Sequence, residues 1–323
     1  MGIVTLNYIE KGSDTMEHID MIDIFDLNLP ERTASYYLPG EAPTLIETSA
    51  APSIPFLLQG LDRRNIDRAS IKYVIVTHIH LDHAGGVGLL MESLPNATVI
   101  VHPRGLRHLI DPTRLIDSAK TVYGEQFDAL FDPIKPVPED RIRSVEDGET
   151  LSIGENRTLT FYDTPGHSNH HLAIHDSLTN SIFTGDTLGT LYPTRFTGGS
   201  ELVLPSTSPT QFDPNQMMTS MKRVRELAPD RIYFGHYGYS DEPDHVYHSL
   251  SEWLNRFIRI SERIYDKHKA EPNDVLVERI AEALFNKVET ESYILDPGIF
   301  DYLTHDLDVS SQGLVDYYRK SGR

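Results

Sequence analysis

Residues 77–86 read THIHLDHAGG and place three histidines and one aspartate within six positions, at His78, His80, Asp82 and His83. Neutral imidazole and carboxylate together suit zinc, iron, manganese or cobalt. The residues just before the cluster, 71–77, read IKYVIVT, a short β-branched and aromatic run that is typical of a buried strand. The cluster therefore lies on the loop that leaves a strand, where α/β proteins commonly place their ligand sites.

The composition excludes several classes of function. The chain has 323 residues and is 39% hydrophobic, which is enough for a sizeable core. Its 29 basic and 48 acidic residues give a net charge of −19, so we expect no nucleic-acid partner. With no cysteine, any metal must be held by nitrogen and oxygen. No apolar run of about 18 residues and no signal-peptide pattern are found, so we expect no membrane partner and a cytoplasmic location.

The order of predicted elements has two similar halves followed by helices. In the first half we expect strands at 3–9, 18–26, 34–38, 43–48, 71–77 and 97–101, and helices at 53–61, 86–94 and 104–131. In the second half we expect strands near 150–153, 157–163, 171–175, 180–184 and 231–234, and a helix at 217–227. Beyond Pro243 we expect helices at 244–268 and 273–287 and a short one around 311–319.

Three further positions repeat the pattern of an apolar strand that ends in a metal-ligand type. His167 follows FYDTPG, Asp186 follows IFTG, and His236 follows IYFG. Each time a glycine lets the backbone of the ligand approach a site closely. The sequence thus offers five histidines and two aspartates. One zinc takes about four ligands, so seven ligands indicate two metal ions that share a bridging carboxylate.

These motifs, in this order, resemble those of the metallo-β-lactamase-fold hydrolase superfamily over about residues 20–240. The resemblance implies an α/β fold, a four-layer αββα sandwich of two β-then-α halves. It implies a catalytic domain over residues 1–242 and a helical C-terminal extension over 243–323 that packs near the active site. It assigns the seven ligands as follows: His78, His80 and His167 to the first metal, Asp82, His83 and His236 to the second, and Asp186 to the bridge.

Differences from the family pattern indicate which members of the superfamily this chain resembles most. The antibiotic-degrading members usually have a cysteine where this chain has Asp186, and the flavin-linked di-iron members carry an extra flavodoxin-like domain; neither feature is found here. The C-terminal helices are similar to those of glyoxalase II. Lactonases have a tyrosine three residues after the bridging aspartate, where this chain has Gly189, so Tyr192 is our candidate for substrate binding. The stretch 164–171, TPGHSNHH, most resembles a less characterised group of stand-alone hydrolases.

The expected function is that of a binuclear metal-dependent hydrolase (EC 3) that cleaves an ester, thioester or lactone. A hydroxide bridging two divalent ions would attack the carbonyl carbon, and Asp82 would orient it and pass its proton on. We expect zinc, with iron or manganese as alternatives, and a small-molecule substrate; a homo-oligomer is compatible with the sequence. His170 and His171 are expected to support the ligands or the fold.

Two other functions stay open at this point. A phosphodiesterase acting on a small nucleotide would need basic residues near the metals, for which Arg104 and Arg195 are the candidates. A di-iron redox protein would need a site for an electron donor, which the sequence does not show.

Overall fold

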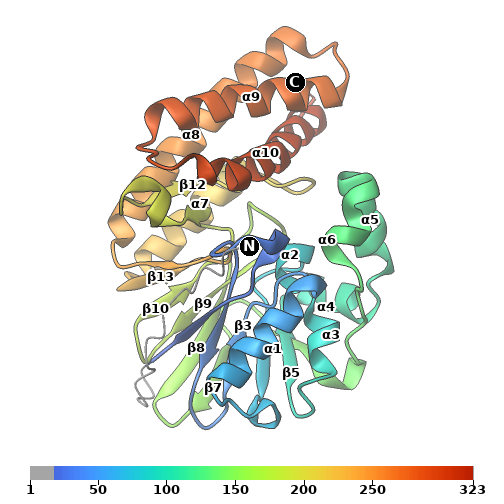
Figure 1. Ribbon diagram of the computed structural model, residues 1–323, viewed down its shortest axis with the longest axis vertical. Helices are drawn as coiled ribbons and strands as arrows, with labels where there is room; N and C mark the ends of the chain where they lie inside the picture. Colours follow the sequence, from blue (N-terminus) through green and yellow to red (C-terminus); the bar gives the residue numbers. More distant parts are fainter. Residues whose placement is uncertain (1–17, 323) are drawn as a thin grey trace, which may run out of the picture.

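The computed structural model describes residues 18–322 and contains two six-stranded β-sheets that pack face to face, with helices on both outer faces (Figure 1). This arrangement confirms the expected α/β sandwich. The strand expected at 3–9 lies outside the described residues. No helix among residues 18–322 is long and apolar enough to cross a membrane.

The first sheet contains its strands in chain order. They are β1 (Asp20–Asp23), β2 (Ala34–Leu38), β3 (Thr44–Ile46), β4 (Tyr73–Ile75), β5 (Thr98–Val101) and β6 (Ile142–Ser144). The pairs β3–β4, β4–β5 and β5–β6 are parallel, whereas β1–β2 and β2–β3 are antiparallel. Parallel neighbours end at the same edge of the sheet, so the loops after β3, β4 and β5 lie side by side.

The second sheet has the order β14–β13–β10–β9–β8–β7. Its strands are β7 (Thr150–Gly154), β8 (Arg157–Asp163), β9 (Leu172–Asp176), β10 (Ser181–Phe183), β13 (Arg231–Tyr233) and β14 (Tyr239–Ser240). Only β10 and β13 are parallel to each other. A separate hairpin, β11 (Thr190–Tyr192) with β12 (Leu202–Leu204), was not predicted.

The core between the two sheets is made of alternate residues of the strands. Ile75 of β4 packs with Phe161 of β8 and Phe183 of β10 in one fully buried cluster. The hydroxyl of Tyr36 on β2 donates to the carbonyl of Phe234, 2.6 Å away, on the opposite sheet. A buried phenol needs such a partner, so this bond also fixes how the sheets align.

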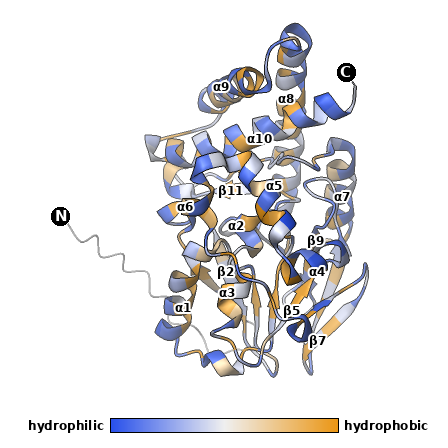
Figure 2. Cartoon of the chain, turned by 90° about the vertical axis from the view of Figure 1, so that its right-hand side faces the viewer, coloured by the Kyte–Doolittle hydropathy of each residue, from blue (hydrophilic) through white to orange (hydrophobic). Residues whose placement is uncertain are grey.

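Helices cover the outer face of each sheet, with their apolar residues turned inward (Figure 2). On the first sheet these are α1 (Ile54–Arg63), α3 (Val87–Met91) and α4 (Pro103–Ile110). On the second they are α7 (Pro214–Glu226) and α8 (Pro243–His268). The helix α8 buries Val246, Leu250, Leu254 and Phe257, as the apolar stripe predicted for 244–268 requires.

The last two helices, α9 (Asn273–Glu291) and α10 (Phe300–Lys320), stack on α8 beyond the strand ends, with α10 nearest to the sheets (Figure 1). The prediction of only a short helix around 311–319 was wrong. Ser310, Ser311 and Gly313 are buried there and interrupt the apolar face that Leu303, Leu307, Leu314 and Tyr318 form. A Cβ on Gly313 would lie 1.8 Å from the carbonyl oxygen of Thr207, which shows how closely α10 approaches the neighbouring loop.

The prediction of a single helix at 104–131 was also wrong. The structure has α4, α5 (Thr113–Tyr123) and α6 (Phe127–Phe131) instead. Pro112 separates the first two, because the residue before a proline disfavours the helical conformation. Gly124 follows α5 with a positive φ of 54° and separates it from α6.

Candidate metal centre

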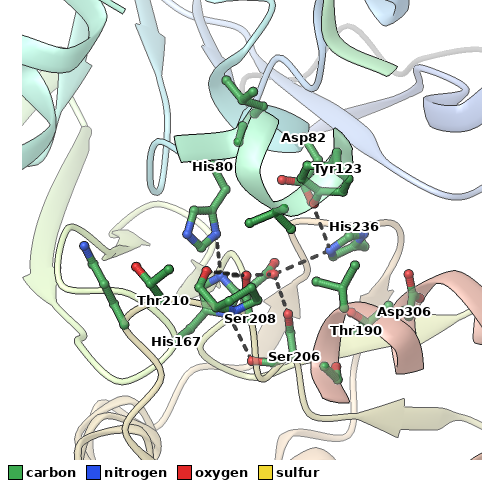
Figure 3. Close-up of a pocket in the computed structure, with 18 of the residues that line it drawn as sticks. His80, Asp82, Tyr123, His167, Thr190, Ser206, Ser208, Thr210, His236 and Asp306 are labelled. Atoms are coloured by element: carbon green, nitrogen blue, oxygen red, sulfur yellow. Dashed lines mark hydrogen bonds and ion pairs between the residues drawn. The ribbon is translucent and has the colours of Figure 1, made fainter. Parts of the chain in front are cut away.

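All seven predicted ligands lie at one edge of the sandwich, just beyond the ends of strands. Figure 3 shows four of them, His80, Asp82, His167 and His236, around one pocket. The loop after β4 carries His78 and His80, and the short helix α2 (Leu81–Ala84) carries Asp82 and His83. The other three follow β8, β10 and β13 and are His167, Asp186 and His236. Residues from both halves of the chain therefore form one site.

The ligand atoms fall into three groups in which all atoms lie within 4.8 Å of one another. The groups are His78, His80 and His167; His78, His83 and Asp186; and Asp82, His83 and His236. The first and third groups match the two sets that the resemblance implies for the first and second metal. The remaining group contains the predicted bridging residue.

Asp186 lies at the centre of the cluster and is 2% exposed. Its Oδ1 is 3.2 Å from His83 Nε2, and its Oδ2 is 3.5 Å from both His167 Nε2 and His236 Nε2. The hydroxyl of Ser206 donates to the same Oδ2 at 2.9 Å. One carboxylate thus faces ligands from both groups, as a bridge between two ions requires.

Several buried ligand atoms have no hydrogen-bond partner. These atoms are His83 Nε2, Asp186 Oδ1 and His236 Nδ1. Buried polar atoms are nearly always satisfied, so the unpaired His83 Nε2 and Asp186 Oδ1, which face each other 3.2 Å apart, indicate a ligand at this point. Imidazole nitrogens and carboxylate oxygens are the donor set of a zinc or iron site. The side chains of this cluster therefore fit bound metal ions.

Outer hydrogen bonds orient the imidazoles toward the centre. His78 Nδ1 lies 3.0 Å from the hydroxyl of Thr77, and His167 Nδ1 donates to the carbonyl of Ser206 at 3.0 Å. The opposite nitrogens, Nε2 of both rings, lie 3.1 and 2.9 Å from His80 Nδ1. Partners of this kind fix the ring orientation and the tautomer that binds metal.

The charge of Asp186 separates the buried histidines into two electrostatic classes. Burial lowers the pKa of His78, His80 and His167 below the usual value, and neighbouring imidazoles add to the effect at His78 and His80. Neutral imidazole is the form that binds metal. Burial also acts on His83 and His236, but Asp186 outweighs it and raises the pKa of both. In turn, although burial opposes it, these two histidines hold the pKa of Asp186 well below its usual range.

Glu47 is a buried residue of the site that the sequence did not reveal. It follows β3, its Oε2 lies 3.1 Å from His83 Nδ1, and its Oε1 accepts from the backbone N–H of Thr77 at 3.0 Å. The signal was a carboxylate directly after an apolar strand. A single carboxylate without a histidine nearby in the sequence did not distinguish it from an ordinary strand end.

His171 supports the site from the second sheet. Its Nε2 accepts from the backbone N–H of Asp186 at 3.1 Å, and its Nδ1 lies 2.9 and 3.0 Å from the hydroxyls of Thr164 and Thr187. It therefore positions the loop of Asp186, the role expected for it. His170 lines the cavity beside the ligands, with its ring 5.4 Å from that of His80.

Gly185 is required by close packing. It has a positive φ of 47°, and a Cβ at this position would lie 2.5 Å from Thr77 Oγ1 and 2.6 Å from His171 Nε2. A larger residue would therefore push Asp186 away from the site or displace Thr77 and His171, which contact His78 and Asp186.

A cavity of about 310 Å³ opens onto the ligands. Tyr192 lines it, but the side chain is 2% exposed and its hydroxyl donates to Asp306 Oδ2 of α10 at 2.8 Å. The other oxygen of Asp306 accepts from Arg32 at 2.7 Å. Contact between Tyr192 and substrate stays a prediction, whereas its bond to α10 is a feature of the structure.

A family model described as the metallo-beta-lactamase superfamily matches residues 29–236. The chain belongs to the metallo-beta-lactamase superfamily. It is 30% identical over 218 residues to a metallo-beta-lactamase fold-containing protein of Sulfurisphaera tokodaii, a match that covers 66% of this chain and 75% of that protein.

A second curated relative within this superfamily carries the name of an enzyme. It is a hydroxyacylglutathione hydrolase of Maricaulis maris, 29% identical over 168 residues, which cover 52% of this chain and 48% of that protein. The chain thus matches only about half the length of this relative.

Two solved metallo-beta-lactamase folds are similar to this structure. The archaeal superfamily protein from Sulfolobus tokodaii has a TM-score of 0.60 and 26% identity, covering 74% of this chain and 86% of that one. A family protein from Thermus thermophilus has a TM-score of 0.62 and covers 94% of both chains, at 17% identity. At that identity the second match shows the fold alone.

Proposed function

We propose that this chain is a binuclear metal-dependent hydrolase that cleaves a carboxylic ester, thioester or lactone. The observation that carries the proposal is the convergence of five histidines and two aspartates around Asp186. His78, His80 and His167 would hold one divalent ion, Asp82, His83 and His236 the other, and Asp186 would bridge them. Zinc suits this donor set best, with iron or manganese as alternatives.

Different residues of the site would serve different steps of the hydrolysis. Bound divalent ions lower the pKa of water to about 7 and polarise a carbonyl group. The carboxylate of Asp82 lines the cavity, is 29% exposed, and lies 3.7 and 3.9 Å from Nε2 of His83 and His236. Asp82 is therefore placed to accept a hydrogen bond from the attacking water and to take its proton. Glu47 and His171 hold His83 and Asp186 in place.

The names of relatives support acyl hydrolysis. Several proteins that are 26 to 29% identical to this chain are hydroxyacylglutathione hydrolases. The phosphodiesterase alternative is not favoured by the arginines singled out for it. Arg104 donates to the carbonyl of Asn169, Arg195 pairs with Glu31, and neither residue lines the cavity. Arg32 and Arg114 do line it, but Arg32 is paired with Asp26 and Asp306.

The test combines elemental analysis with a panel of thioester, lactone, β-lactam and phosphodiester substrates. We expect about two metal equivalents per chain, hydrolysis of a thioester, ester or lactone, and loss of activity on chelation that added metal reverses. The variant Asp82→Asn should lower kcat by about 10²-fold or more, the range for a positioned general base. The exposed Asp117→Asn, on α5, is the matched control.

Two outcomes would overturn the proposal. One is hydrolysis of the phosphodiester alone. The other is turnover that persists unchanged after the metal has been removed and its loss verified.

A further inference from the structure

The cavity at the metal centre is small, and one of its walls is apolar. Its volume of about 310 Å³ is at the lower end of the range of about 300–1,000 Å³ for small-molecule sites. Leu115, Ala119 and Val122, all half-buried on α5, form one wall, and Leu307 of α10 faces the same space. Any substrate much larger than an acyl head group must extend beyond this cavity.

A second cavity adjoins the first on the side of the C-terminal helices. It has a volume of about 980 Å³ and lies between α5, α9 and α10. Val122, Pro209 and Leu307 line both cavities, so only the thickness of these side chains separates the two spaces. The second cavity therefore adjoins the site, and movement of these three shared side chains would join the two spaces.

The floor of the second cavity is an apolar stripe on α9. Val277, Ala281 and Phe285 line it and recur every four residues, so they lie on one face of the helix. All three are half-buried. The buried side chains of Leu307 and Val315 continue this surface on α10. A long apolar surface of this kind suits a hydrocarbon chain.

Acidic residues form the rim of the second cavity, which we call the groove. Asp274, Glu278, Glu282, Asp308 and Asp316 line it, together with a single basic residue, Arg319. Like charge repels like, so this rim disfavours a substrate whose far end is anionic.

We propose that the substrate carries an extended, uncharged hydrocarbon chain on its acyl group. The carbonyl lies in the first cavity beside the metal centre, and the tail runs past Val122, Pro209 and Leu307 along the stripe of Val277, Ala281 and Phe285. This inference rests on the proposed hydrolase function and adds to it the chemical class of the substrate.

A blocking variant and a matched control test the groove. Ala281→Trp places a bulky ring in it, whereas Ala283→Trp makes the same change at a half-buried position of α9 that does not line the cavity. Ala281→Glu and Ala283→Glu form a second pair, in which a charge replaces bulk. Far-ultraviolet circular dichroism verifies that each variant is folded.

The readout is the ratio of kcat/KM for 4-nitrophenyl dodecanoate to that for 4-nitrophenyl butanoate, because this ratio cancels any general loss of activity. In the wild type we expect the ratio to rise by about four-fold for each methylene that the groove buries, which corresponds to about 0.8 kcal/mol. We expect both Ala281 variants to lower the ratio by at least ten-fold and both Ala283 variants to keep it. A ratio near one in the wild type, or one that Ala281→Trp leaves unchanged, would overturn the inference.

Calorimetric binding of dodecanoate and butanoate separates this inference from the proposed function. If no ester, thioester or lactone is hydrolysed, the hydrolase proposal fails. Tighter binding of dodecanoate that Ala281→Trp abolishes and Ala283→Trp preserves would still support the groove. Equal affinities for the two acids would exclude it.

Discussion

Glu47 acts on the metal centre through His83. Its carboxylate is 2% exposed and accepts from the ring of a predicted ligand and from the backbone of Thr77. We expect Glu47→Gln to keep the shape and the backbone bond but to lower metal affinity by about 10- to 100-fold, because the charge that orients and strengthens His83 is lost. Competition with a chromophoric chelator measures the affinity. The exposed Glu92→Gln is the control, and equal affinities in the two variants would contradict this role.

Substitution of Gly185 tests whether close packing or backbone conformation requires a glycine in the loop before Asp186. Gly124 has a similar φ of 54°, but no atom lies within 4 Å of the position of its Cβ, whereas at Gly185 two site residues do. Gly124→Ala should therefore cost only the backbone strain of its positive φ, about 1–3 kcal/mol. We expect Gly185→Ala to cost more and also to lower the metal content. Urea unfolding measures both costs; equal values would show that packing at Gly185 is unimportant.

The residues of the centre were predictable to the extent that their chemistry is local. Each of the seven ligands follows an apolar strand within a few positions, and the count of imidazoles exceeds any structural need. Glu47 and Ser206 were not predictable, because each acts through a contact with a residue far away in the chain. Tyr192 was singled out for substrate, yet its hydroxyl bonds to Asp306, which is 114 positions away.

At the scale of elements, strands were easier to predict than the helices around the site. An apolar run reports burial on both faces of a sheet directly. The helix α10 gives no such signal at Ser310, Ser311 and Gly313, because small residues there allow close approach to the loop of Thr207. Leu303, Leu307, Leu314 and Tyr318 continue the buried face on either side, but the small residues interrupt the apolar pattern in the middle of the helix.

The helix α10 is anchored to the site by a buried ion pair. Arg32, whose side chain is 4% exposed, lies between Asp306 at 2.7 Å and Asp26 at 3.3 Å. We expect Asp306→Asn to destabilise the fold by about 1.5–3 kcal/mol, the cost of a lost hydrogen bond to a charged group, because Asp26 still pairs with Arg32. Tyr192→Phe removes the other bond to the same carboxylate and should cost only about 1 kcal/mol. Urea unfolding compares the two variants, and similar losses would mean that the ion pair is not the anchor.

The ion pair between Arg32 and Asp306 predicts how the stability of the fold depends on pH. Burial raises the pKa of Asp306, but Arg32 and then His236 outweigh burial, and the pKa falls below its usual value. A lowered folded-state pKa stabilises the fold above the unfolded value of about 3.9, and this stabilisation is lost as the pH falls through the folded value. The difference in stability between wild type and Asp306→Asn should therefore be constant from neutral pH to about 5 and shrink below about 4. A difference that grows on acidification would contradict this assignment.

At the scale of the whole molecule, the predicted metal ligands come from both halves of the sandwich. His78, His80, Asp82 and His83 follow the fourth strand of the first sheet, whereas His167, Asp186 and His236 follow strands of the second. Metal that binds only the folded chain stabilises it by about 2.7 kcal/mol when the free metal is at 100 times its Kd. A change of 1 kcal/mol shifts Tm by roughly 2–4 °C in a domain of about 150–250 residues, so chelation should lower Tm by roughly 5–10 °C.

Scanning calorimetry with and without chelator measures this shift, and added zinc should restore it. Magnesium should not, because it prefers oxygen ligands in octahedral geometry to imidazole. His167→Ala provides the decisive comparison, because it removes a ligand of the second half and leaves His78 and His80 in place. If the metals join the two halves, this variant should already have a lowered Tm and show a smaller loss on chelation. A full chelation shift in His167→Ala would mean that the ligands of the first half alone account for the metal-dependent stability.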